Sequence, residues 1–173
     1  MVNVGSLQKR KGQVLSVRLL HELIKSDIKC ELHLVGGIID ENYLTQINKV
    51  SEDLGVAKFL FVHGHKDNYL DYMAHSDIIL QTSYSEGVSR ILREAMLMEK
   101  PIATFSISGT NDLLDNDCAI LATPFVVEDL ANKIKAALKD NNKLNNLKQN
   151  ALNEYKNNNS RTAYYKNILS TFK

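Results

Sequence analysis

The sequence predicts an α/β protein, with a Rossmann-like, doubly wound parallel sheet of about six strands and helices on both faces. Short apolar runs alternate with longer segments in which apolar residues recur at helical spacing, and this alternation repeats about six times. Such a repeat favours parallel strands, because each intervening helix returns the chain to the same edge of the sheet. The expected strands are residues 1–4, 31–35, 58–62, 77–81, 101–105 and 118–122.

The segments between these runs carry apolar residues at the spacing of amphipathic helices. In the first segment Val14, Val17, Leu20 and Ile24 form one stripe. We expect each stripe to face the sheet, where it buries its apolar surface. The other stripes are Leu44, Ile47, Val50 and Leu54; Leu70 and Met73; Ile91, Ala95 and Met98; and Leu130, Ile134 and Leu138.

The last part of the chain differs in composition from the rest. Residues 139–160 are rich in Asn and Lys, yet they keep leucines at spacings that suit a polar helix. Ser160 is expected to cap one more helix beyond it. We therefore expect residues 1–140 to form the sheet domain and residues 141–173 to form a helical tail that packs on it.

Composition narrows the class of protein. The 173 residues are 44% hydrophobic and 24% charged, which is typical of a soluble domain with one core. The formal net charge of +1 is too small for nucleic acid as the main partner. No apolar run reaches the roughly 18 residues of a membrane helix, and the start lacks a signal-peptide core. Cys30 and Cys118 are far apart and are typical of core residues in a reducing compartment. Together these features predict a cytoplasmic protein.

Glycines follow the first five expected strands. They are Gly5, the pair Gly36-Gly37, Gly64, Gly87 and Gly109. In a parallel sheet these loops share one edge, and ligands bind at that edge. Glycines also end strands where no ligand binds, so these residues alone do not identify a site.

Two carboxylates stand near the fourth of these loops. Glu86 precedes Gly87 just before an expected helix, and Glu94 follows after seven intervening residues. Amide groups at a helix N-terminus attract phosphates, and a carboxylate can accept both hydroxyls of a diol such as ribose. A simpler interpretation is that Glu86 favours the helix dipole and that Glu94 pairs with Arg90 one turn away. Spacing alone favours the simpler interpretation.

The residues around the pair form a specific pattern. The stretch SEGVSRILREAMLMEKPIAT (residues 85–104) resembles the nucleotide-sugar-binding signature of retaining glycosyltransferases with the GT-B fold, of the family 4 type (group 1). The stretch VGSLQKRKG (residues 4–12) is similar to the first phosphate loop of that family. Residues 32–37, 59–83 and 106–134 resemble its other strand blocks, so the resemblance covers most of the chain. It implies the C-terminal, donor-binding domain of a GT-B enzyme.

The resemblance also implies roles for individual residues. Glu86 would contact the donor sugar, Glu94 the nucleotide ribose and Lys11 the diphosphate. Backbone amides of Gly87, Val88 and Ser89 would meet the sugar and phosphate. Gly5 and Ser6 belong to the first phosphate loop, and Val62, His63 and Gly64 would lie near the base.

The sequence departs from the family pattern at several positions. Ser6 replaces the arginine that usually follows the glycine of the first loop, and Arg10 beside Lys11 is expected to supply that charge. Ser89 replaces a usual glycine, and the following Arg90 resembles the branch that builds surface polysaccharides. Asp112 and Glu99 replace a usual glutamate and glycine. These departures bear on phosphate affinity and donor choice rather than on the fold.

The implied activity is transfer of a sugar from a UDP- or GDP-sugar to a hydroxyl of a glycan or lipid-linked acceptor. The acceptor-binding N-terminal domain has no counterpart in these residues, so we expect a domain fragment or one subunit of a split enzyme, inactive or nearly so alone. Lys11 and Arg10 would stabilise the leaving diphosphate, with Glu86 orienting the sugar, and neither cofactor nor metal is expected. Peripheral association of the full enzyme with the inner face of a membrane is left open.

Other functions remain as alternatives. A GT-B sugar-nucleotide epimerase would bind the same donor, and a non-catalytic regulatory module would bind no nucleotide. A phospho-receiver domain is disfavoured because Gly5-Ser6 follows the first strand where an acidic cluster is needed. The spacing of His63 and His65 and the sequence Asp115-Asn116-Asp117 are both weak signals for a metal.

Overall fold

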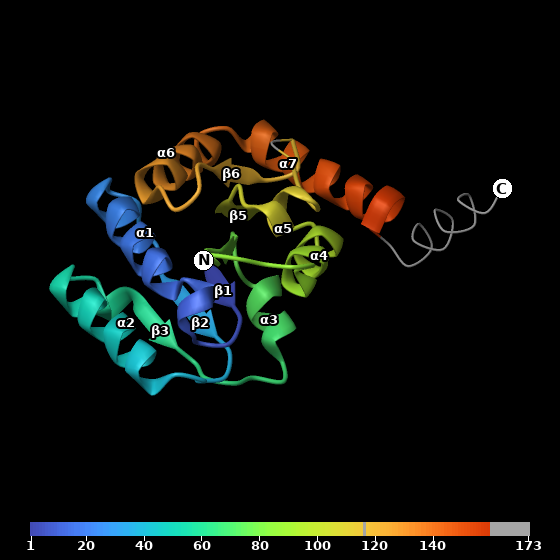
Figure 1. Ribbon diagram of the computed structural model, residues 1–173. Coiled ribbons are helices and arrows are strands. Elements are labelled where there is room, and N and C mark those ends of the chain that lie inside the picture. Colours follow the sequence, from blue (N-terminus) through green and yellow to red (C-terminus); the bar gives the residue numbers. More distant parts are fainter. Residues whose placement is uncertain (116, 160–173) are drawn as a thin grey trace.

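The computed structural model describes residues 1–115 and 117–159, which form a single six-stranded sheet (Figure 1). Its order is β3-β2-β1-β4-β5-β6, and every neighbouring pair is parallel. The predicted fold class is therefore confirmed, although the strands begin one or two residues later than the apolar runs. They are β1 Val2–Val4, β2 Leu32–Val35, β3 Leu60–Val62, β4 Ile79–Gln81, β5 Ile102–Phe105 and β6 Ile120–Ala122.

A helix follows each of the six strands in the chain. Side-chain caps mark several helix starts: Asp40, Ser89 and Asp140 each accept a hydrogen bond from a first-turn amide of the following helix. The helices are α1 Gln13–Lys25, α2 Glu41–Asp53, α3 Tyr69–Ala74, α4 Arg90–Leu97, α5 Ser108–Asn111, α6 Val127–Leu138 and α7 Asn141–Glu154, with short helical turns η1 Lys9–Lys11, η2 Ala57–Phe59 and η3 Tyr155–Asn159.

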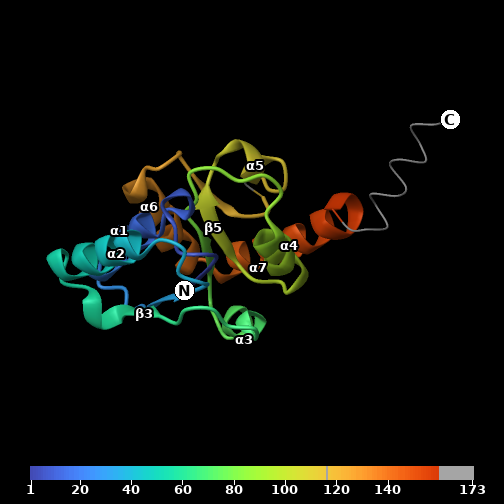
Figure 2. The same ribbon diagram turned by 60° about the horizontal axis from the view of Figure 1, so that its bottom comes forward.

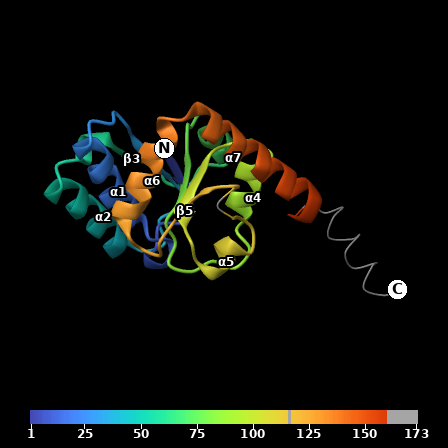
Figure 3. The same ribbon diagram turned by 90° about the horizontal axis from the view of Figure 1, so that it is seen from above.

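The sheet separates two apolar cores. Figure 3 shows α1, α2 and α6 on one side of β5, and α4 and α7 on the other. Successive strand residues alternate between these layers: Leu80 belongs to the core under α1 and α6, and Ile79 belongs to the core under α3 and α4. Helices therefore cover both faces, as the two-sided burial of a parallel sheet demands.

Most predicted helix stripes face these cores, but not every member does. Leu20, Ile47 and Ala95 are buried, whereas Leu70 is 44% exposed and Leu138 is 40% exposed. Leu70 lies on the outer side of the short helix α3, whose Met73 is buried and whose Tyr69 and Tyr72 pack against the same core.

Helix α7 is the longest element of the described C-terminal part. Helix α7 packs against α4 and α6, and its Leu147, Ala151 and Leu152 are buried. The expected cap at Ser160 and the helix beyond it lie outside the described residues. In the part of the chain that the structure describes, no helix has both the length and the apolar character of a membrane span.

Candidate functional site

A cavity of about 510 Å³ lies at the carboxyl edge of the sheet, where β1 and β4 are neighbours. The strand order reverses at this point, so the loops after β1 and β4 leave toward opposite faces and a crevice opens between them. The predicted site residues that line the cavity are Gly5, Ser6, Lys11, Glu86, Val88, Ser89 and Arg90. The structure thus brings together two segments that are about 75 residues apart in the chain.

At one end of the cavity, Glu86 is surrounded by donors. Lys11 Nζ lies 2.6 Å from its Oε1, and Ser83 Oγ donates to the same oxygen at 2.5 Å. Arg10 Nη1 is 3.8 Å from Oε2. The Glu86 side chain is only 7% exposed, so this carboxylate is a nearly buried group whose charge the protein itself neutralises.

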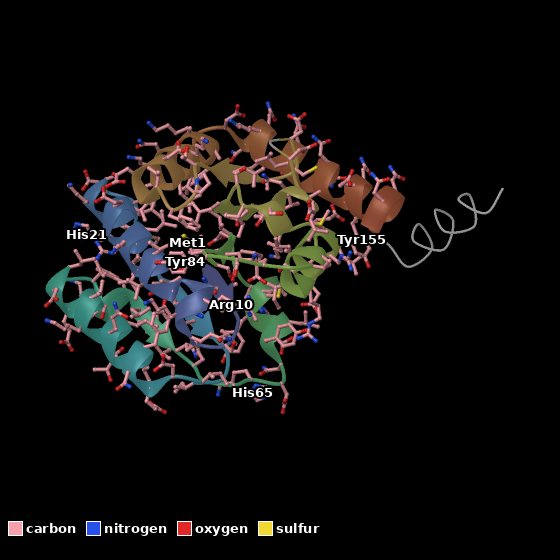
Figure 4. All side chains as sticks on the ribbon, viewed as in Figure 1. Met1, Arg10, His21, His65, Tyr84 and Tyr155 are labelled. Atoms are coloured by element: carbon pink, nitrogen blue, oxygen red, sulfur yellow. The ribbon has the colours of Figure 1, made fainter. Side chains whose placement is uncertain are left out.

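The loops that carry Lys11 and Glu86 are fastened to each other through their backbones. Tyr84 N donates to Arg10 O at 2.9 Å, and Arg10 Nη1 donates to Ser85 O at 3.0 Å. Figure 4 labels Arg10 and Tyr84 close together on these two loops. Gly12 has a φ of +65°, and a Cβ at this position would overlap the carbonyl oxygen of Thr82. A glycine is therefore needed where the loops cross.

A buried polar network supports the crossing from below. Asn3 Nδ2 donates to Ser16 Oγ at 2.9 Å and to Thr82 Oγ1 at 3.2 Å. The two hydroxyl oxygens are 2.7 Å apart, and Thr82 Oγ1 also donates to Gly12 O at 2.9 Å. All three side chains are buried, so their mutual hydrogen bonds fix β1, α1 and β4 relative to one another.

At the other end, Glu94 is held by two residues of the cavity wall. Tyr69 Oη donates to Glu94 Oε1 at 2.9 Å, and Arg90 Nε is 3.5 Å from the same oxygen. The Arg90 guanidinium also lies 5.7 Å from the centre of the Tyr69 ring. Glu94 Oε2 is enclosed and has no hydrogen-bond partner among the described residues. The predicted pairing with Arg90 is therefore present, but it does not satisfy the carboxylate.

The start of α4 faces the cavity between the two carboxylates. Ser89 Oγ accepts from Leu92 N at 3.3 Å and donates to Gln81 Oε1 at 2.7 Å, so the cap is tied to the end of β4. The amides of Val88 and Ser89 precede the first helical hydrogen bonds, and amides in this position attract anions.

Gly87 does not line the cavity and is exposed, but its carbonyl oxygen lies close to Gly109. The short helix α5 lies directly beyond β5 (Figure 2). A Cβ on its Gly109 would overlap the carbonyl oxygens of Glu86 and Gly87. The loop after β5 therefore supports the loop that carries Glu86.

His63 and Gly64, which were expected near the base, lie apart from this cavity. His63 Nε2 is 3.0 Å from His33 Nδ1, and its ring packs against Tyr72. Burial, with help from His33 and Lys66, lowers the pKa of His63. Gly64 touches the site indirectly, because its carbonyl accepts from the amide of Gly36, which does line the cavity.

Several lining residues were not predicted. His65 and Lys66 come from the loop between β3 and α3, where Figure 4 labels His65, and Tyr69 begins α3. Gly36 and Gly37 line the cavity too, and their place after the second strand was the available signal. Burial and the hydrogen bond to Glu94 raise the pKa of Tyr69, so its phenol keeps its proton at neutral pH.

The residues of the two weak metal signals make hydrogen bonds within the protein: His63 with His33, His65 with Asp67, and Asp117 with Asp115. Asp115 Oδ1 accepts from Asp117 N at 2.9 Å, as in a turn that caps itself. Among the described residues, no three His, Cys, Asp or Glu side chains are grouped to hold an ion. Cys118 is buried, which raises its pKa to about 12, and Cys30 is half-buried.

A larger cavity of about 1020 Å³ lies around Met1 and the amino ends of the strands. His33, His63 and Tyr72 line part of it. Ligands of parallel sheets bind at the carboxyl ends, where the loop glycines and the two carboxylates gather. The smaller cavity is therefore the candidate site.

Comparison with known proteins decides the family. The profile described as "Glycosyl transferases group 1" matches residues 1–154. The chain belongs to this family. The family assignment agrees with the resemblance that the motif around Glu86 and Glu94 carries.

Two curated relatives are glycosyltransferases. The lipopolysaccharide glucosyltransferase WaaG of Escherichia coli (strain K12) is 27% identical over 140 residues, which are 80% of this chain and 37% of the relative. The poly(ribitol-phosphate) alpha-N-acetylglucosaminyltransferase of Staphylococcus aureus (strain COL) is 25% identical over 122 residues, which are 69% of this chain and 24% of the relative. The chain thus spans less than half the length of these group 1 relatives.

Solved structures share the fold. The Anabaena protein HepE, in complex with UDP-glucose, superposes with a TM-score of 0.85 and 23% identity over 99% of this chain and 48% of that chain. The C-terminal domain of the Francisella tularensis group 1 protein LpcC gives a TM-score of 0.77 and 15% identity over 90% of this chain and 83% of that domain.

Proposed function

We propose that the chain is the donor-binding half of a retaining glycosyltransferase, which moves a sugar from a UDP- or GDP-sugar to a hydroxyl acceptor in cell-surface polysaccharide or glycolipid synthesis. Family membership and the activities named for the curated relatives support this assignment. The observation that carries it is one cavity lined by Lys11, Glu86 and the start of α4, with Glu94 held behind Tyr69 and Arg90 of the cavity wall.

The arrangement suits a diphosphate flanked by a sugar and a ribose. As the glycosidic bond breaks, the leaving diphosphate gains negative charge, and fixed donors stabilise that charge most where water is excluded. In this proposal Lys11 and the amides of Val88 and Ser89, which belong to lining residues, would do so, and Arg10 beside Glu86 would add positive charge. We expect nucleotide binding to persist in EDTA, because these groups supply the positive charge.

Glu86 has two tasks in this proposal. In the structure it neutralises Lys11, whose Nζ lies 2.6 Å from Glu86 Oε1. When a diphosphate binds, Lys11 turns to the phosphate and Glu86 accepts hydroxyls of the sugar ring instead. A carboxylate kept nearly dry by the surrounding loops binds such hydroxyls more strongly than one in water.

The remaining partners lie beyond these residues. The acceptor would bind a second domain across the cavity, and these residues by themselves are expected to transfer little sugar, because transfer needs donor and acceptor held together. Cytoplasmic location and peripheral membrane association of the full enzyme belong to the same proposal.

Calorimetric titration of the chain with UDP, GDP and their sugars tests the proposal. We expect saturable binding by one nucleotide, weakened about tenfold or more by Lys11→Ala and by Glu94→Ala, because each removes a charged hydrogen-bonding group. Lys49→Ala is the matched control, since Lys49 pairs with Asp53 on the exposed side of α2. Absence of binding by every nucleotide, or equal losses in all three variants, would contradict a donor site here.

A further inference from the structure

We propose that Tyr69 is a positioning residue for Glu94: its phenol holds one carboxylate oxygen as a pivot, so that the second oxygen meets a ribose hydroxyl and the site selects ribonucleotides over deoxynucleotides. This inference rests on the proposed function, because it assumes that a nucleotide occupies the cavity. It adds a residue that neither the motif nor the family assignment marks.

The first support is that the two oxygens of Glu94 differ in their hydrogen-bond partners. Oε1 receives the Tyr69 phenol at 2.9 Å and lies 3.5 Å from Arg90 Nε. Oε2 is enclosed and has no partner among the described residues. A buried carboxylate oxygen without a donor is costly, so a hydroxyl that reaches it replaces a deficit rather than an existing bond.

The second support is position. Tyr69 and Arg90 line the cavity, whereas Glu94 stands behind them in the wall. A ribose therefore meets Glu94 only if the carboxylate turns toward the cavity. Several torsions of the glutamate side chain, changed together, can turn Oε2 toward the cavity while Oε1 stays near the phenol, whereas a carboxylate without that contact would point in many directions. The phenol limits that freedom because it stays attached to Oε1.

The third support is the rigidity of the phenol itself. Tyr69 is at the first position of α3, its ring is half-buried, and the Arg90 guanidinium lies 5.7 Å from the ring centre. A tyrosine has few rotatable bonds, so its hydroxyl is a well-defined donor. The Tyr69 phenol keeps its proton at neutral pH, so it can donate a hydrogen bond to Glu94 there.

The selectivity for ribose provides the test, because a residue that merely forms the wall would not change it. The affinities of the ribonucleotide that binds best and of its 2′-deoxy and 3′-deoxy forms are measured by calorimetry for the wild type, Tyr69→Phe and Glu94→Gln. Tyr72→Phe is the matched control, because it removes a phenol from the same helix but outside this cavity.

We expect the wild type to prefer the ribonucleotide over at least one deoxy form by about tenfold. Tyr69→Phe should reduce that ratio to about threefold, Glu94→Gln should bring it close to one, and Tyr72→Phe should leave it unchanged. The double variant of Tyr69 and Glu94 should match Glu94→Gln alone, since both residues act on the same hydroxyl.

Other results would overturn the inference in distinguishable ways. If Tyr69→Phe weakens ribo and deoxy forms equally, Tyr69 is only part of the wall. If the wild type binds nucleotide but does not distinguish ribose from deoxyribose, the Glu94 pivot is not used. If the wild type binds no nucleotide, the proposed function fails first. Thermal unfolding of each variant separates these outcomes from misfolding.

Discussion

The two glutamates of the site, Glu86 and Glu94, carry the same functional group but differ in how fully their oxygens are paired with donors. Glu86 is 7% exposed and accepts from Lys11 and Ser83, with Arg10 nearby. The Glu94 side chain is 23% exposed. One of its oxygens accepts a hydrogen bond from Tyr69 and lies near Arg90, and the other has no donor among the described residues. One end of the cavity is therefore satisfied by the protein itself, and the other is not.

Because of this difference, a ligand gains a different free energy of binding at each carboxylate. A group that binds near Glu86 must exchange with an existing ion pair, so its gain is the difference between two strong interactions. A hydroxyl that binds Glu94 fills a vacant acceptor, so its gain includes removal of a buried deficit. Affinity at the Glu86 end should therefore depend on the charge of the ligand, and affinity at the Glu94 end on the presence of a hydroxyl group.

The largest expected effect comes from breaking the Glu86 end through its backbone. Gly12→Ala forces a Cβ into the carbonyl oxygen of Thr82 at a φ of +65°. We expect the free energy of unfolding to fall by about 3 kcal/mol, measured by urea denaturation. Nucleotide binding should weaken as well, because Lys11 and Glu86 lose their alignment.

Gly55→Ala is the control for this experiment. Gly55 has a φ of +69°, but a Cβ there would meet nothing within 4 Å. It should therefore cost only the backbone strain of about 1 kcal/mol. Equal costs for the two variants would mean that the crossing of the two loops does not depend on Gly12.

Replacing each carboxylate by its amide should have an intermediate effect, and the two substitutions compare Glu86 with Glu94 directly. Glu86→Gln removes a negative charge beside Lys11 and frees the lysine for a diphosphate, so UDP or GDP without sugar should bind about threefold more tightly. Glu94→Gln should weaken the same nucleotide about tenfold, because an amide accepts a ribose hydroxyl less strongly than a carboxylate. Calorimetry with the free nucleotide measures both.

The opposite signs are the informative part of that comparison. If both variants weaken binding, Glu86 contacts the nucleotide directly instead of competing with it for Lys11. Glu99→Gln serves as a further control, because Glu99 is an exposed carboxylate that accepts from Gln149 at 2.5 Å, away from the cavity.

The smallest effect is expected from Arg90. Its side chain is 77% exposed, and it lies 3.5 Å from Glu94 within one helix. Arg90→Gln should change the free energy of unfolding by less than about 0.5 kcal/mol, so the melting temperature should move by no more than about 2 °C. A larger loss would show that Arg90, rather than Tyr69, holds Glu94 in place.

Much of the fold could be predicted because it depends on local patterns. The alternation of apolar runs and helical stripes marked all six strands, and the glycines after them marked the loops around the cavity. The motif identified Glu86 and Glu94 because its residues are close together in the chain. Their roles toward a nucleotide sugar stay predictions.

What could not be predicted depends on contacts between distant segments. The hydrogen bond from Tyr69 to Glu94 joins residues 25 apart, and the Lys11–Glu86 pair joins residues 75 apart. No local spacing encodes either. The position of His63 follows from the pleat of the strand: its amide still bonds to Leu34 O, so its side chain continues the alternation of β3 and faces the same side as Phe61.

The seam between β1 and β4 has a consequence for how the molecule folds. The two strands pair in register at Val2 and Ile79, and the remaining connections across the seam come from the buried network of Asn3 and from the crossing loops. Contacts between such distant segments form only after a long loop has closed, which is slow compared with growth of a helix. We therefore expect the cavity to be completed only after the two halves of the sheet have met. A molecule that lies across the seam binds only the assembled domain, so its binding energy adds to the cooperativity of the whole chain.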